Sequence, residues 1–138
     1  MGRERILVDT SFLVAWLNKK DIHHKKAFQV KNELGSKAVL VITDVVVNET
    51  LSVLARRAQE GKLSFHEASQ KLLSLVPSPA KFYFYTFSDW NEIISLVLKS
   101  NGQLNFHDAL LIIGAKKEGI TTILSFDSDF DGYLQRKP

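Results

Sequence analysis

Four acidic residues stand where a carboxylate can do chemistry instead of only facing water. They are Asp9, Glu49, Asp108 and Asp127. If the fold brings these carboxylates together, they cannot all stay ionised without a compensating cation. Their hard oxygen atoms favour Mg²⁺ or Mn²⁺, and the chain has no cysteine and no HxxxH pair that would favour zinc. One or two such ions can bind a phosphate, activate water for in-line attack and neutralise a leaving oxygen.

Two of these acids are expected at one edge of a sheet. Asp9 ends the apolar run Arg5–Val8, and Asp127 lies just past the strand expected at Thr121–Ser125. In open α/β sheets, sites form beyond the carboxyl ends of the strands, so both side chains should reach the same edge. Each also has a simpler interpretation, Asp9 as a helix cap and Asp127 as an ordinary turn residue.

The other two acids lie on expected helices. Glu49 has Val45 and Val46 one turn before it, and a carboxylate in such an apolar stripe needs either a partner or a chemical role. A salt bridge to an arginine is the simpler alternative. Asp108 precedes the almost wholly apolar segment 109–115, where favourable interaction with the helix N-terminus is the simpler alternative.

Two further residues lie at spacings from Asp9 and Glu49 that would let them assist the acids. Ser11, two residues after Asp9, is expected either to hydrogen-bond that carboxylate or to cap a helix. Arg56 lies seven residues after Glu49, roughly 10 Å away along one helix face, and suits either a substrate phosphate or an acid.

A fifth acid, Asp129, shares one turn with Asp127, and either could serve as the fourth carboxylate. His107 adjoins Asp108 and is expected to be a neighbour of the site, not a catalyst. The basic stretch Lys19–Lys26 contains four lysines and two histidines that could contact phosphate, although a solvated charged segment is the favoured interpretation.

Strands and helices that alternate along the chain must position these residues. They predict an α/β three-layer sandwich with a mainly parallel central sheet of about four to five strands flanked by helices. The expected strands are Arg5–Val8, Val39–Ile42, Lys81–Phe87 and Thr121–Ser125. The expected helices cover Ser11–Asn18, a segment ending near Leu34, Asp44 to about Glu60, Ser64–Leu75, Asp89 to about Gly102, and Phe106–Glu118.

Composition sets limits on the class of protein. The 138 residues suit a single domain over residues 1–138, and 18 Lys+Arg against 15 Asp+Glu give a net charge of +3, a weak indication of a nucleic-acid partner. The longest apolar stretch, 109–115, is far short of the ~20 residues that span a bilayer. Asp9 interrupts the N-terminal apolar run too early for a signal peptide, so a cytoplasmic protein without membrane attachment is expected.

Four stretches together resemble the PIN-domain nucleases. They contain the four acids in order: Leu7–Leu13, Thr43–Leu51, Phe106–Leu110 and Ser125–Phe130. The resemblance spans essentially the whole chain. Within that superfamily, the chain looks most like the compact toxins of VapBC-type toxin–antitoxin modules.

The resemblance implies Mg²⁺- or Mn²⁺-dependent hydrolysis of RNA phosphodiester bonds. It implies that Asp9, Glu49, Asp108 and Asp127 are metal ligands, directly or through water, and it further implies a homodimer and a cognate antitoxin. The alternatives are a non-catalytic PIN-like module that binds RNA or protein, and an RNA-processing nuclease without an antitoxin. A receiver or haloacid-type phosphatase fits poorly, because Asp9 has no acidic neighbour within two residues.

Overall fold

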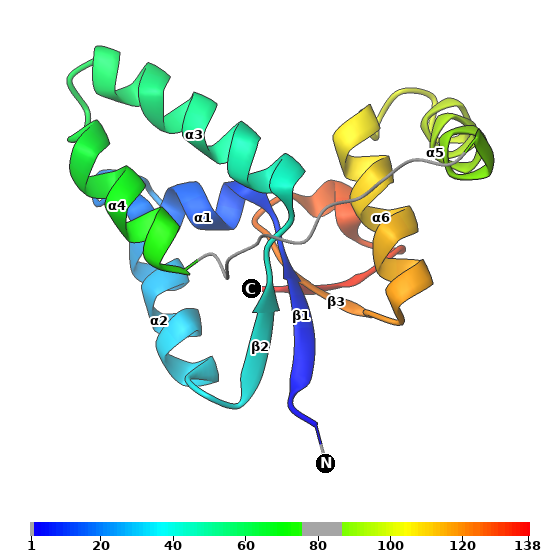
Figure 1. The fold of residues 1–138 in the computed structure, drawn as a ribbon, viewed down its shortest axis with the longest axis horizontal. Helices are drawn as coiled ribbons and strands as arrows, with labels where there is room; N and C mark the ends of the chain where they lie inside the picture. The colour runs from blue at the N-terminus through cyan, green and yellow to red at the C-terminus, as the bar shows by residue number, and fades with distance from the viewer. Residues whose placement is uncertain (1, 76–86) are drawn as a thin grey trace.

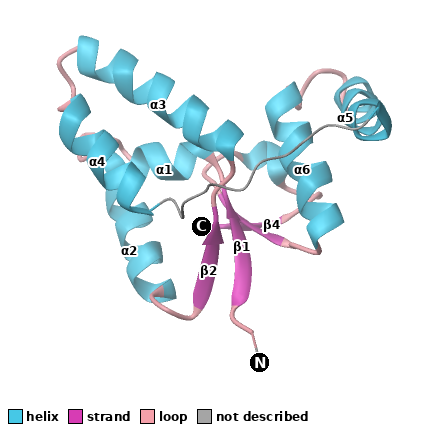
Figure 2. Ribbon diagram, in the orientation of Figure 1, coloured by secondary structure: helices cyan, strands magenta, loops and turns pink. Residues whose placement is uncertain are grey.

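A parallel sheet lies at the centre of the computed structural model, which describes residues 2–75 and 87–138. Within these residues the sheet has four strands in the order β2-β1-β3-β4, and every neighbouring pair is parallel. Figure 2 shows the strands between two groups of helices. The strands are β1 (Glu4–Val8), β2 (Ala38–Val41), β3 (Thr122–Leu124) and β4 (Gln135–Lys137).

Helices flank the sheet in two groups. In Figure 1, α1 to α4 gather on one side of the sheet, whereas α5 and α6 lie together on the other. The predicted α/β architecture with a parallel sheet between helices is therefore confirmed. The helices are α1 (Thr10–Leu17), α2 (His24–Leu34), α3 (Asp44–Gln59), α4 (Phe65–Leu75), α5 (Phe87–Lys99) and α6 (Phe106–Glu118).

The central strands are apolar because both of their faces are covered. Ile6, Leu7 and Val8 of β1 are fully buried, and so is every residue of β3. Helix α6 is apolar nearly all round because it packs against the core on more than one side. Its Leu111 belongs to the main core, whereas Leu110 packs in a second cluster against α5. The elements that carry Asp9, Asp108 and Asp127 are therefore held by the core.

Side chains and a glycine set the ends of the two helices that carry Glu49 and Asp108. Thr43 caps α3 by accepting a hydrogen bond from the Val46 N–H at 3.3 Å. Asn105 caps α6 by accepting from the Asp108 N–H at 2.8 Å. Gly119 ends α6 at a φ of 70°, in the left-handed region that glycine adopts without strain.

The strand β4 was not expected from the sequence. Its residues Gln135–Lys137 are polar, because an edge strand is held by backbone hydrogen bonds and need not bury both faces. The Ser125 N–H donates to the Lys137 carbonyl at 2.8 Å. The strand expected at Lys81–Phe87 lies outside the described residues, apart from Phe87, which is the first residue of α5.

No helix in residues 2–75 or 87–138 is long and apolar enough to cross a membrane.

Candidate active site

The carboxyl ends of β1 and β3 open onto a pocket of about 320 Å³. The strand order changes direction here, since β1 has β2 on one side and β3 on the other, and parallel sheets form sites at such points. The two acids that follow these strands meet at one edge of the sheet, as expected, and two acids from helices join them. All four predicted acids line the pocket: Asp9, Glu49, Asp108 and Asp127.

Asp9 is the most buried of these acids, with only 7% of its surface exposed. Both the Ser11 and the Ser125 hydroxyl donate to its Oδ2, at 2.9 and 2.8 Å. Asp9 occupies the N-cap position of α1, as the simpler interpretation expected, but its side chain makes no capping hydrogen bond there. Burial raises the pKa of Asp9 above its ordinary value, while the two hydroxyl hydrogen bonds oppose that rise.

The same two hydroxyls also hold the acidic turn after β3. The Ser11 Oγ accepts from the Phe126 N–H, and the Ser125 Oγ accepts from the Asp127 N–H, both at 3.0 Å. One hydrogen-bonded network thus joins the end of β1 to the turn that carries Asp127. Ser125 was missed in the sequence because a serine after a strand gives no signal of its own.

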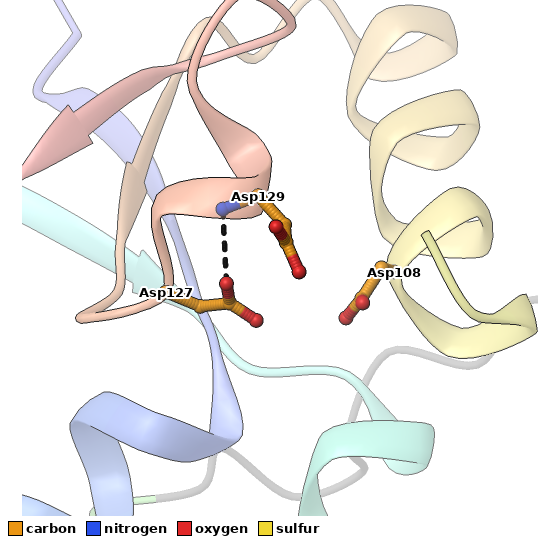
Figure 3. A group of neighbouring side chains, drawn as sticks. All are labelled: Asp108, Asp127 and Asp129. Atoms are coloured by element: carbon orange, nitrogen blue, oxygen red, sulfur yellow. Dashed lines mark hydrogen bonds between the residues drawn. The ribbon is translucent and has the colours of Figure 1, made fainter. Parts of the chain in front are cut away.

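Three carboxylates from two elements converge beside the pocket. The side-chain oxygens of Asp108, Asp127 and Asp129 include one from each residue within 4.8 Å of the others. Figure 3 shows Asp108 on α6 pointing toward the other two in the turn after β3. The Asp129 N–H donates to Asp127 Oδ1 at 2.9 Å, and Gln103 donates to Asp129 Oδ1 at 3.0 Å. Both candidates for the fourth acid therefore face Asp108.

The carboxyl group of Asp108 is available to the site because Asn105 caps the helix in its place. Burial, followed by repulsion from Asp9 and Asp127, raises the pKa of Asp108 to about 6. A divalent cation would relieve this repulsion, and the all-oxygen donor set fits a hard ion such as Mg²⁺ or Mn²⁺. Asp108, Asp127 and Asp129 are the residues best placed to hold it.

Glu49 pairs with a histidine and not with an arginine. The His107 Nδ1 donates to Glu49 Oε2 at 2.8 Å, and this contact links α6 to α3. His107 was expected only to adjoin Asp108. The two residues are 58 positions apart, so the sequence offered no pattern that pairs them.

The arginine that lines the pocket is Arg57. Glu49, Val53 and Arg57 lie four residues apart on α3, and all three line the pocket. Arg56 is exposed and is not among the lining residues. Residues seven apart on a helix, such as Glu49 and Arg56, lie on a line nearly parallel to the helix axis. The residues that line the pocket are four apart instead, and they form a row inclined to that axis.

The chain matches the family described as PIN domain over residues 6–133. No curated protein matches it.

Several solved structures share the fold. The chain is similar to VapC20 of Mycobacterium tuberculosis, a sarcin–ricin-loop-cleaving toxin, with a TM-score of 0.76, 23% identity, and coverage of 96% of this chain and 99% of that chain. It is similar to VapBC2 of Rickettsia felis bound to a promoter DNA fragment (TM-score 0.68, 14% identity, 96% and 97% covered). It is also similar to a toxin–antitoxin complex from Klebsiella pneumoniae (TM-score 0.64, 15% identity, 96% of each chain covered).

The raised pKa of Asp108 predicts a measurable effect of pH. Its folded pKa of about 6 exceeds the ordinary value of 3.8, so the folded state disfavours the charged form. The metal-free protein should therefore gain stability as pH falls from 7 through 6, and Asp108→Asn should remove that part of the gain. At pH 7 the variant should be more stable by about 1 kcal/mol, less than the full shift implies because the carboxyl group is partly exposed.

The measurement is urea unfolding in EDTA at pH 7 and pH 5. Asp131→Asn is the matched control, because Arg136 holds the pKa of Asp131 below its ordinary value and the effect should have the opposite sign. With Mn²⁺ present, the unmodified chain should become the more stable protein. An Asp108→Asn variant that is less stable in EDTA at pH 7 would contradict the electrostatic account.

Proposed function

The chain belongs to the PIN domain family, and we propose that it is a metal-dependent endoribonuclease that hydrolyses RNA phosphodiester bonds. The observation that carries the proposal is the convergence of Asp108, Asp127 and Asp129 beside the pocket that Asp9 and Glu49 also line. Burial, together with repulsion among these carboxylates, raises the pKa of Asp108, and such a cluster is costly unless a cation is held there. A domain that only binds RNA or protein has no need of it.

Asp108, Asp127 and Asp129 would hold Mg²⁺ or Mn²⁺, with Asp9 and Glu49 contributing directly or through water. The ion supplies neutralisation of the phosphate charge and a lower pKa for the attacking water. In the reaction the water would give up a proton as its oxygen bonds to phosphorus, the bond from phosphorus to the leaving ribose oxygen would break, and that oxygen would take up a proton, so that no net proton is gained or lost.

The chain's own residues prepare the site before RNA arrives. The Ser11 and Ser125 hydroxyls fix the orientation of the Asp9 carboxylate, so that no reorganisation is needed during the reaction. His107 holds Glu49 in the same way from α6. Arg57 lines the pocket, so its guanidinium can reach an RNA phosphate bound there.

We further propose that the chain is a toxin restrained by a cognate antitoxin. The similar solved structures that are toxins or toxin–antitoxin complexes support this role. We also propose a homodimer, in which exposed apolar side chains such as Trp90, Leu98 and Tyr133 could be buried. Expression of the unmodified chain should arrest growth, and a purified chain that sediments as a strict monomer at high concentration would exclude the homodimer.

The nuclease proposal is tested by cleavage of a mixed RNA pool. The unmodified chain should cut RNA in Mn²⁺ and not in EDTA. Asp9→Asn and Asp108→Asn should each lose at least about 100-fold in rate, because each removes a charge from the metal site. Asp131→Asn, an exposed acid paired with Arg136, is the matched control and should cleave normally.

Other results of the cleavage assay would contradict the proposal or narrow it. Undiminished cleavage by either site variant would show that the acids are wrongly assigned. Binding of Mn²⁺ without any cleavage of the pool would point to an unusually narrow RNA substrate, whereas no binding of Mn²⁺ at all would favour a binding module.

A further inference from the structure

Three aromatic rings run in series from the core to the rim of the pocket. Phe12 of α1 is buried, Phe126 follows β3 and is half-buried, and His23 precedes α2 and is exposed. The rings of Phe12 and Phe126 have centroids 5.9 Å apart and an interplanar angle of 10°. Those of His23 and Phe126 are 4.3 Å apart at 9°. The exposed imidazole therefore lies flat on a ring that the core supports.

This pair of rings borders the acidic site. His23 and Phe126 both line the pocket that contains the carboxylates. Phe126 immediately precedes Asp127, and its N–H donates to the Ser11 hydroxyl that also holds Asp9. The network that positions the acids thus also positions the aromatic surface.

The backbone around His23 is held on both sides. Its N–H donates to Asp21 Oδ1 at 2.8 Å, and its carbonyl accepts from the Ala27 N–H at 2.9 Å. Among the described residues, no hydrogen bond is made by either ring nitrogen of His23. The ring is therefore fixed in place by stacking and by its backbone, while its polar edge stays available to a ligand.

We propose that the His23 ring, backed by Phe126, is the stacking platform for the nucleobase next to the scissile phosphate of single-stranded RNA. This inference rests on the proposed nuclease function and adds a substrate-positioning surface to it. Unpaired bases stack on aromatic side chains, histidine included, whereas bases inside a duplex are not free to do so. Arg57, on the wall of the same pocket, provides the positive charge that a neighbouring phosphate needs.

Stacking also defines what the platform selects. Every base has a π-face, so the platform favours an unpaired nucleotide over a paired one and discriminates weakly among base types. The structure therefore assigns to His23 the choice of single-stranded loops or ends as substrates, and assigns the cutting itself to the acids.

The test uses a single-stranded RNA oligonucleotide that spans a cut site mapped in the pool assay. His23→Ala should raise KM about tenfold, within the range that loss of one stacked base produces, and change kcat by less than about twofold. His23→Phe should restore KM to within about twofold, because it keeps the ring. His23→Lys, which has a positive charge but no ring, should not restore it.

Phe28→Ala is the matched control, because Phe28 is an exposed aromatic residue on α2 that does not line the acidic pocket. It should leave KM unchanged. As a readout independent of cleavage, 2-aminopurine placed beside the cut bond should lose fluorescence on binding the unmodified chain in EDTA. It should not do so with His23→Ala.

The outcomes separate the two proposals. Metal-dependent cleavage by His23→Ala with unchanged KM and unchanged 2-aminopurine quenching would overturn the platform and leave the nuclease intact. Restoration of KM by lysine but not by phenylalanine would also overturn it, in favour of a charge contact. Absence of cleavage by the unmodified chain would overturn the proposed nuclease function and the platform that rests on it.

Discussion

The buried carboxylate of Asp9 is the constraint on which the rest of the site depends. An anion removed from water costs several kcal/mol unless hydrogen bonds replace its hydration. Here the replacement comes from two hydroxyls on different elements, Ser11 on α1 and Ser125 after β3. Satisfying one carboxylate therefore holds the ends of β1 and β3 together, and the same hydroxyls accept from the backbone that carries Asp127.

With the ends of β1 and β3 held together, helices that pack against the core position Glu49 and Asp108. The apolar faces of α6 leave only its first turn at the site, so Asp108 meets Asp127 and Asp129. The pKa of Asp108 is raised by burial and then by repulsion from Asp9 and Asp127, which the chain's own residues do not relieve. A site built in this way is less stable without a cation, and a divalent cation of the kind we propose would stabilise it.

Much of this arrangement could be predicted from sequence because burial leaves a pattern. The apolar runs at β1 and β3 identified strands covered on both faces, and parallel pairing then brought Asp9 and Asp127 to one edge. Features without a burial pattern were missed, such as the polar edge strand β4. The sequence also could not predict individual side-chain contacts. Whether Arg56 or Arg57 lines the pocket depends on how α3 is inclined to it. The contact of His107 with Glu49 joins segments that are far apart in the sequence.

The most direct test of the central claim is calorimetric titration of Mn²⁺ into the metal-free chain and its Ser125→Ala variant. The account predicts that the unmodified chain binds Mn²⁺ and that the variant binds it roughly 10- to 100-fold more weakly, because a residue that orients the ligands has been removed. Ser69→Ala, whose hydroxyl bonds only carbonyls within α4, should bind like the unmodified chain. Equal affinity in the unmodified chain and Ser125→Ala, or no binding to either, would contradict the account.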